Sequence, residues 1–237
     1  MHKISLIFFF IFSLTPQLKA SEYEITVLAT NTANFGGIGE WSFSALLESE
    51  EEKILFDTGF DENTVLHNAK LLNKDLSKVE KVILSHFHGD HTGGLIKLRQ
   101  TYMKYNPYAF SKVYVAEGFF EQRYDNEGNL RGFIGGFNEV ENFLVEAKRL
   151  GINFITLNQS EEISPNLYLS GPVERIFESV VVSPGFFLKR NGRLEADMVK
   201  DDQSLGILTN EGWYMMSGCG HAGMINTAHK FNTIVDV

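Results

Sequence analysis

Hydrophobic and polar residues follow one another with two different periods along this chain. Short apolar runs, and stretches in which every second residue is apolar, predict strands, whereas apolar residues three and four positions apart predict helices. The pattern predicts helices at 63–73, 95–105 and 139–150, with another after His221, and strands at 22–28, 41–47, 53–56, 79–84, 113–116, 154–157, 167–170, 180–183, 204–209 and 213–217. The second and third of these strands are expected to pair.

The order of these elements indicates the class of fold. Strands and helices alternate early in the chain and strands then follow one another, which is typical of sheets covered by helices. We therefore expect a layered α/β or α+β protein. With 237 residues and no internal repeat or linker, the chain is expected to form one domain. Gly151 is predicted to end a helix in the left-handed conformation, and the glycine-rich and aromatic-rich stretch 119–137 to be a loop over a functional site.

The first twenty residues have the pattern of a secretory signal peptide. Lys3 supplies a positive charge, residues 4–14 form an apolar run, and Ala20 is the small residue that a signal peptidase prefers. The run is shorter than the roughly 20 residues that span a bilayer. We therefore predict a signal peptide at 1–20, a mature domain at 21–237, and export to the periplasm or out of the cell. The alternative is a retained membrane tether.

Charge and cysteine content narrow the functional classes. The formal net charge is −9 and there is no run of Lys or Arg, which argues against binding of nucleic acid through its phosphates. Cys219 is the single cysteine, so no internal disulfide can form.

The strongest chemical signal is the segment His86–His91, which reads His-Phe-His-Gly-Asp-His, whereas only four histidines lie elsewhere in the chain. Imidazole and carboxylate groups are ligands of zinc and similar divalent metals. His86 and His88 are two positions apart, so in an extended segment their rings point the same way and can hold one metal. Asp90 and His91 point differently and suit a second metal, about 3.5–4 Å from the first.

Two other strand ends carry candidate residues. Asp57 follows the strand at 53–56 and is either a turn-forming residue or the acceptor that orients a metal-bound imidazole. His221 lies in a glycine-rich turn after the strand at 213–217, and we predict that it is a metal ligand. Cys219, two residues earlier, is either a soft ligand or a small buried residue.

Two neighbouring aspartates and two further histidines remain as candidates for a role near the metals. Asp201 and Asp202 precede the strand at 204–209. They are either the solvated start of a hairpin or carboxylates that reach the metals. His67 and His229 lie in helical patterns and are expected to be non-ligands.

The pattern His86-x-His88-x-Asp90-His91, with Val-Ile-Leu-Ser before it and Asp57-Thr-Gly upstream, resembles the metallo-β-lactamase superfamily. That resemblance implies an αββα sandwich with a dinuclear metal site at one sheet edge. It further implies that His86 and His88 bind the first metal, and Asp90 and His91 the second. Asp57 would be the buried acid that orients the binding loop.

Within the superfamily, the chain resembles the branch of the dihydropterin-ribofuranosylaminobenzene-phosphate synthase. The resemblance extends from Tyr23 to Asn226 and implies that His221 binds the metals or lies beside them, with Asp202 as a tentative further ligand. Gly220 stands where the branch has Ser. The resemblance rests on segments 91–95, 170–178, 201–205 and 218–226.

Members of this branch continue past the second histidine segment with a Gly-Gly-Phe-His-Leu-type segment and a His-Cys-Thr-Gly-type segment. This sequence stops at Val237 without them, and its similar Gly135-Gly136-Phe137 is followed by Asn138 in place of His. We therefore expect the second half of the sandwich to be incomplete. Either the chain is a fragment or another chain supplies the missing ligands.

These features favour an exported, zinc-dependent metallo-hydrolase, with two Zn²⁺ ions if the site is complete. A metal-bound hydroxide would attack an ester, phosphoester or amide, and Asp90 would be catalytic by holding the second metal and orienting the nucleophile. Synthase activity is not expected of an exported enzyme. The expected partner is a small-molecule substrate, with no nucleic acid and no membrane after signal cleavage, and a homodimer is left open. The alternative is a truncated, inactive, metal-binding remnant.

Overall fold

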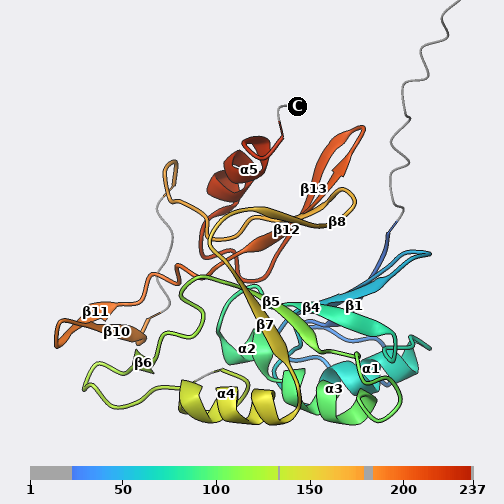
Figure 1. Cartoon of the computed structure of the whole chain (residues 1–237), viewed down its shortest axis with the longest axis horizontal. Helices are drawn as coiled ribbons and strands as arrows, with labels where there is room; N and C mark the ends of the chain where they lie inside the picture. Colours follow the sequence, from blue (N-terminus) through green and yellow to red (C-terminus); the bar gives the residue numbers. More distant parts are fainter. Residues whose placement is uncertain (1–22, 133, 179–183, 236–237) are drawn as a thin grey trace, which may run out of the picture.

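The computed structural model describes residues 23–132, 134–178 and 184–235, and it arranges them in layers (Figure 1). Three helices cover one face of a six-stranded sheet, and a four-stranded sheet packs against the other face. A last helix covers the outer face of the smaller sheet. The predicted αββα order of layers is therefore confirmed.

The six-stranded sheet carries most of the early chain. Its first three strands are antiparallel neighbours, whereas the third to the sixth run parallel to one another. In spatial order the strands are β1 (Glu24–Ala29), β2 (Ser44–Glu48), β3 (Lys53–Phe56), β4 (Val79–Ile83), β5 (Lys112–Ala116) and β7 (Asn153–Leu157).

The helices of the first half lie close to the predicted positions. Gly151 has a φ of 69°, which confirms the predicted left-handed end of the third long helix. A short helix that was not predicted carries part of the His86–His91 segment. The four helices are α1 (Thr64–Leu71), α2 (Gly89–Thr92), α3 (Leu95–Tyr102) and α4 (Val140–Arg149).

The second half consists of an antiparallel sheet and one helix. The helix packs on the outer face of the sheet, where the rings of Trp213 and Phe231 lie 5.1 Å apart. Gly206 makes room for this contact, because a Cβ there would lie 2.5 Å from the Phe231 ring. The elements, with the strands in spatial order, are β13 (Gly212–Ser217), β12 (Ser204–Thr209), β9 (Leu167–Leu169), β8 (Glu161–Ser164) and the helix α5 (Met224–Asn232).

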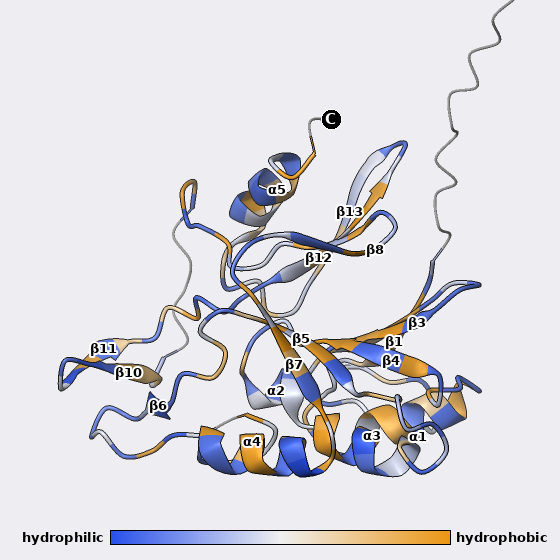
Figure 2. Cartoon of the chain, viewed as in Figure 1, coloured by the Kyte–Doolittle hydropathy of each residue, from blue (hydrophilic) through white to orange (hydrophobic). Residues whose placement is uncertain are grey.

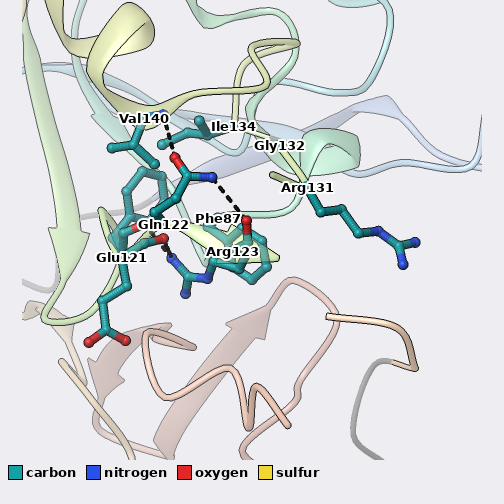
Figure 3. Close-up of a pocket in the computed structure, with 9 residues that line it drawn as sticks. Phe87, Glu121, Gln122, Arg123, Arg131, Gly132, Ile134 and Val140 are labelled. Atoms are coloured by element: carbon teal, nitrogen blue, oxygen red, sulfur yellow. Dashed lines mark hydrogen bonds between the residues drawn. The ribbon is translucent and has the colours of Figure 1, made fainter. Parts of the chain in front are cut away.

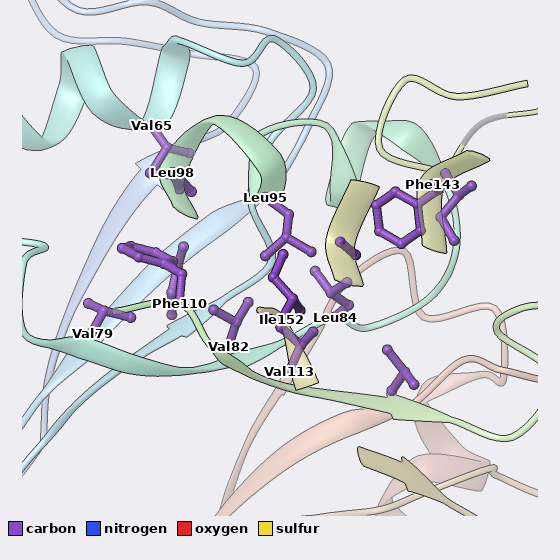
Figure 4. Close-up of a cluster of buried hydrophobic side chains, with 14 of the residues drawn as sticks. Val65, Val79, Val82, Leu84, Leu95, Leu98, Phe110, Val113, Phe143 and Ile152 are labelled. Atoms are coloured by element: carbon purple, nitrogen blue, oxygen red, sulfur yellow. The ribbon is translucent and has the colours of Figure 1, made fainter. Parts of the chain in front are cut away.

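Two apolar cores explain why the layers pack as they do. Alternate residues of the six-stranded sheet face opposite sides: Leu55 packs with the helix layer, and its neighbours Ile54 and Phe56 pack with the small sheet. Figure 4 shows the helix-side core, in which Val82 and Leu84 of the sheet region lie near Leu95 of α3. In Figure 2 the sheet is largely hydrophobic, and α4 shows the alternating colours of an amphipathic helix.

A small third sheet was not predicted. Its strands are β6 (Arg123–Tyr124), β10 (Phe187–Arg190) and β11 (Arg193–Ala196). The last two form a hairpin whose turn residues Asn191 and Gly192 have φ values of 48° and 78°. The loop predicted at 119–137 is largely irregular and contains β6.

Some expectations fall outside the described residues. The predicted signal peptide at 1–20 and the predicted strand at 180–183 both do. Among the residues that are described, none of the helices has the length and apolar character needed to cross a membrane.

Candidate metal centre

Two loops meet at one edge of the sandwich. The parallel strands β3 and β4 end there, β3 leading into Asp57 and β4 leading into residues 86–91, the first loop. The smaller sheet reaches the same edge, because the Gln203 amide donates to the Ser85 carbonyl oxygen at 2.9 Å. β13 ends there too and leads into residues 218–222, the second loop. The two loops carry most of the predicted ligands.

One group of ligand atoms combines both loops. Atoms of His86, His88, Cys219 and His221 all lie within 4.8 Å of one another. His86 Nε2 and His88 Nδ1 are 2.9 Å apart, and the His221 ring centroid is 4.8 Å from that of His86. His221 Nε2 is buried and has no hydrogen-bond partner among the described residues. The structure thus brings His86 and His88, the predicted ligands of the first metal, together with His221, which was predicted to bind the metals or lie beside them.

A second group lies beside the first. Atoms of Asp90, His91 and Cys219 also lie within 4.8 Å of one another. His91 Nε2 is 3.2 Å from Cys219 Sγ and 3.5 Å from Asp90 Oδ2. Cys219 therefore belongs to both groups and links them.

Asp57 orients this second group. It is fully buried, and its Oδ1 accepts the Ser85 amide at 2.7 Å. Its Oδ2 accepts the Ser85 hydroxyl at 2.8 Å and lies 2.6 Å from His91 Nδ1. A hydrogen bond at Nδ1 leaves Nε2 of His91 as the atom that faces Asp90 and Cys219. The geometry therefore favours an orienting role for Asp57 over that of a simple turn residue.

Burial keeps three of the histidines neutral. It lowers the pKa of His86 well below the usual value, and the nearby His91 lowers it further. Burial and the neighbouring His221 likewise lower the pKa of His88. Burial, with a contribution from His91, lowers the pKa of His221 to about 4. Because metals bind neutral imidazole, these side chains are in the binding form near neutral pH.

His91 and Asp90 have the opposite electrostatic setting. Burial alone would lower the pKa of His91, but the carboxylate of Asp57 raises it well above the usual value. Burial would raise the pKa of Asp90, yet its contact with His91 lowers it. Both directions favour a positive charge on His91 beside the two carboxylates, and a cation bound at His91 Nε2 would replace the proton there.

Asp201 and Asp202 are both buried, which rules out the solvated hairpin start. Asp202 joins neither group of ligand atoms in the described structure, in contrast to its tentative assignment as a ligand. Its Oδ2 instead accepts the Ala222 amide at 2.7 Å, and its Oδ1 has no partner among the described residues. Burial raises the pKa of Asp202 to about 7 and that of Asp201 to about 6.

The donor atoms present fit divalent metals. Nitrogen, sulfur and carboxylate oxygen are the ligands that zinc and similar ions take. The buried His221 Nε2, which has no hydrogen-bond partner within the described ranges, is the atom that such an ion would satisfy. His67 and His229 lie in neither group, as predicted: His67 Nε2 is 2.7 Å from the Gly36 carbonyl oxygen, and the His229 ring packs on Phe177.

The structure decides one open alternative at this edge and adds one residue that the sequence did not indicate. Cys219 is exposed and belongs to both ligand groups, which favours a soft ligand over a small buried residue. Arg123 was not singled out at all. It is buried, pairs with Asp197 and Asp201, and lies 3.7 Å from the centre of the Phe87 ring. No signal in the sequence marks it, because its partners are about 75 residues away.

Comparisons with known proteins agree with this geometry. The family model of the metallo-β-lactamase superfamily matches residues 42–152, which include the first loop. A solved structure, Tm1679, described as a metal-dependent hydrolase of the β-lactamase superfamily, superposes with a TM-score of 0.66 at 28% identity, covering 91% of this chain and 73% of that one.

Two relatives from Methanocaldococcus jannaschii are also similar over most of the chain. One is the 7,8-dihydropterin-6-methyl-4-(β-D-ribofuranosyl)-aminobenzene-5′-phosphate synthase, 28% identical over 222 residues, or 90% of this chain and 72% of the relative. The other is an uncharacterised protein, 31% identical over 205 residues, or 85% of this chain and 71% of the relative. The first match confirms the predicted resemblance to the synthase branch. In sequence and in fold, therefore, the chain belongs to the metallo-β-lactamase superfamily.

Proposed function

We propose that this protein is a metal-dependent hydrolase that acts on an ester, phosphoester or amide bond of a small molecule. The observation that carries the proposal is the pair of ligand groups that share Cys219 at one edge of the sandwich. When bound, divalent metals at such a pair supply a hydroxide nucleophile near neutral pH and polarise the bond under attack. Nitrogen and sulfur donors favour zinc.

The protein's own residues would have distinct tasks. His86, His88 and His221 would hold one ion, and Asp90 and His91 the other. Asp57 would keep His91 in the tautomer that presents Nε2, because it binds the Nδ1 side. Asp90 is less buried than the histidines of the first loop, with 14% of its side chain exposed, and it would orient the nucleophile that the metals supply.

The names of two similar proteins point to different reactions. One is called a synthase and the other a hydrolase, and both are 28% identical to this chain. We favour hydrolysis because water is the co-substrate that a pair of metal-binding groups activates without any further cofactor. Turnover assays should therefore begin with phosphodiesters and lactones. Product formation with water as the only co-substrate supports hydrolysis. Turnover of pterin precursors and of no other substrate would overturn it.

The substitution Asp90→Ala tests the role of the second group. We expect it to reduce both the bound metal, measured by elemental analysis, and the rate of hydrolysis. His229→Ala is the matched control, because His229 lies in neither ligand group of the described structure. Unchanged metal content and unchanged turnover in the Asp90 variant would contradict the assignment. A parent chain that binds metal but hydrolyses none of the substrates would favour the inactive remnant.

We also propose that the protein is exported and that residues 1–20 are its signal peptide. The support is the charged, apolar and small-residue pattern at the N-terminus. N-terminal sequencing of the protein from the producing cell tests the proposal. A mature chain that begins at Ser21 is the expected result, and a chain that still begins at Met1 would contradict it.

A further inference from the structure

Residues 201–203, the bridge segment, lie between the two loops and touch both. Asp201 Oδ2 accepts the amide of Phe87, the residue between His86 and His88, at 2.9 Å. Asp202 Oδ2 accepts the amide of Ala222, the residue after His221, at 2.7 Å. Two consecutive carboxylates thus each bind the backbone of a different loop, directly beside a predicted ligand.

The third residue of the bridge segment reaches the root of the first loop. The Gln203 amide donates to the Ser85 carbonyl oxygen at 2.9 Å, and its side chain donates to the Leu84 carbonyl oxygen at 3.0 Å. Asp201 and Gln203 therefore bind the first loop and the residues before it, whereas Asp202 binds the second loop. One short stretch thus holds the backbone of both loops.

Asp201 is itself held in place by a buried arginine. Arg123 Nη2 lies 2.8 Å from Asp201 Oδ1, and Arg123 Nε lies 2.9 Å from Asp197 Oδ2. The same guanidinium lies 3.7 Å from the centre of the Phe87 ring, and Figure 3 shows the two side chains beside one another. Arg123 thus contacts the side chain of Phe87, and Asp201 accepts the backbone amide of the same residue. Phe87, in the middle of the first loop, is therefore held through both its side chain and its backbone.

Burying two consecutive carboxylates lowers the stability of the fold. Asp201 and Asp202 have 0% and 1% of their surface exposed. A buried carboxylate destabilises a fold unless it is paired and fully hydrogen-bonded. Arg123 compensates Asp201, but Oδ1 of Asp202 has no hydrogen-bond partner in the part of the chain that is described. A nearby divalent cation would offset such a negative charge. Carboxylates commonly lie behind metal ligands in this way.

We propose that Asp201 and Asp202 are positioning residues that fix the distance between the two loops, and so the geometry of the metal centre. Neither carboxylate has to touch a metal for this role. Asp201 sets the place of His86 and His88, and Asp202 sets the place of His221. The inference rests on the metal centre under the proposed function and adds how that centre is assembled from two sheets.

The test is metal binding by the purified full chain and its variants, with no substrate involved. Removing a group behind a metal ligand typically costs about 10–100-fold in metal affinity, and we expect a loss of this size for Asp202→Ala. Asp202→Asn should recover much of the affinity, because its amide oxygen can still accept the Ala222 amide. With Co²⁺ as the probe, the visible absorption bands should shift in Asp202→Ala while the number of bound ions stays the same.

Asn68→Ala is the control. Asn68 is buried, as Asp202 is, but its side chain donates to the carbonyl oxygens of Leu28 and Ile38 and not to the backbone of either loop. We expect this variant to lower the free energy of unfolding and to keep the parent's Co²⁺ spectrum. Asp201→Ala should also shift the Co²⁺ spectrum. If that variant does not fold, Asp201→Asn and Arg123→Lys serve in its place, and either should shift the spectrum.

The outcomes separate this inference from the proposed function. If the parent binds no metal, both are overturned. If the parent binds metal and the Asp201 and Asp202 variants match it in affinity and spectrum, the positioning role alone is overturned. If Asp202→Ala binds fewer ions and Asp202→Asn does not restore them, Asp202 is a direct ligand and the positioning role is again wrong.

Discussion

The two loops at the metal centre are built differently. In the first loop His86, His88 and His91 are 0%, 6% and 3% exposed. This loop follows β4, an inner strand of the larger sheet. In the second loop Cys219 is exposed and His221 is only partly buried. The first loop is therefore buried in the core, whereas the second loop is more exposed and packs against the first.

This difference suggests a division of labour. Groups behind the first loop, above all Asp57, should govern the stability of the whole domain. Groups of the second loop should govern how tightly the metal is bound, since they complete a site that the first loop has already formed. Four substitutions test this division, from the largest expected effect to the smallest.

Asp57→Ala should have the largest effect. It removes the acceptor of the Ser85 amide, the Ser85 hydroxyl and His91 Nδ1, all of them buried. Breaking such a buried pair costs about 3–5 kcal/mol, which urea unfolding of the metal-free chain would measure. Glu80→Ala, at an exposed position of β4, is the control and should cost about 0.5 kcal/mol or less, as is usual at the surface. An equal cost for the two variants would contradict the special role of Asp57.

Gly218→Ala tests the contact between the loops. A Cβ at this position would lie 2.2 Å from Ser85 Oγ and 3.0 Å from Asp57 Oδ2. Overpacking of this kind costs about 1–3 kcal/mol, and it should push the second loop away and weaken metal binding as well. Ser217→Ala adds no atom, although it removes a hydroxyl that bonds Ser204, so it should leave the second loop in place and keep the metal affinity. Parent-like metal affinity in the Gly218 variant would show that the two loops need not lie this close.

Cys219→Ser should separate metal affinity from stability. Because the thiol is exposed, the free energy of unfolding should change by no more than about 0.5 kcal/mol. Metal affinity should fall, and the near-ultraviolet absorption that a sulfur ligand gives with Co²⁺ should disappear. A Co²⁺ titration of both proteins measures the two effects. If the absorption is the same in both, the sulfur is not a ligand.

The smallest effect concerns pH. The pKa of His221 falls from 6.5 to about 4 on folding because the ring is buried. The unfolded chain therefore takes up this proton first, so the contribution of His221 to stability is complete above pH 6.5 and is lost as the pH falls towards 4. The metal-free parent should lose stability over this range more steeply than His221→Gln. The raised pKa of Asp202 acts in the opposite direction, but Asp202 is present in both chains, so its effect cancels in the comparison. Parallel curves of stability against pH for the two proteins would contradict the prediction.

Much of the fold could be predicted because its signals are local. Strand β3 was predicted with its observed bounds, since a short apolar run followed by Asp57-Thr58-Gly59 is unambiguous. The hairpin of β10 and β11 was missed, although Asn191-Gly192 is a strong turn signal. Its strands carry several charged residues and bury little, so they lack the apolar alternation on which the prediction depended.

The candidate site divides in the same way. The His86–His91 segment is contiguous, so the sequence alone indicates metal chemistry there. The sharing of Cys219 by two ligand groups depends on how the sheets meet, which spacing along the chain does not specify. The same holds for Asp202, whose tentative assignment as a ligand gives way in the structure to a hydrogen bond with the Ala222 amide.

The central claim is that both loops together form a metal centre. The most direct test is elemental analysis of the purified chain beginning at Ser21, combined with its thermal unfolding with and without a chelator. Two ligand groups predict about two ions per chain, as in two-metal sites generally, and a cooperative transition that the chelator shifts to lower temperature. A chain that binds no metal, and that unfolds at the same temperature with chelator, would contradict the account.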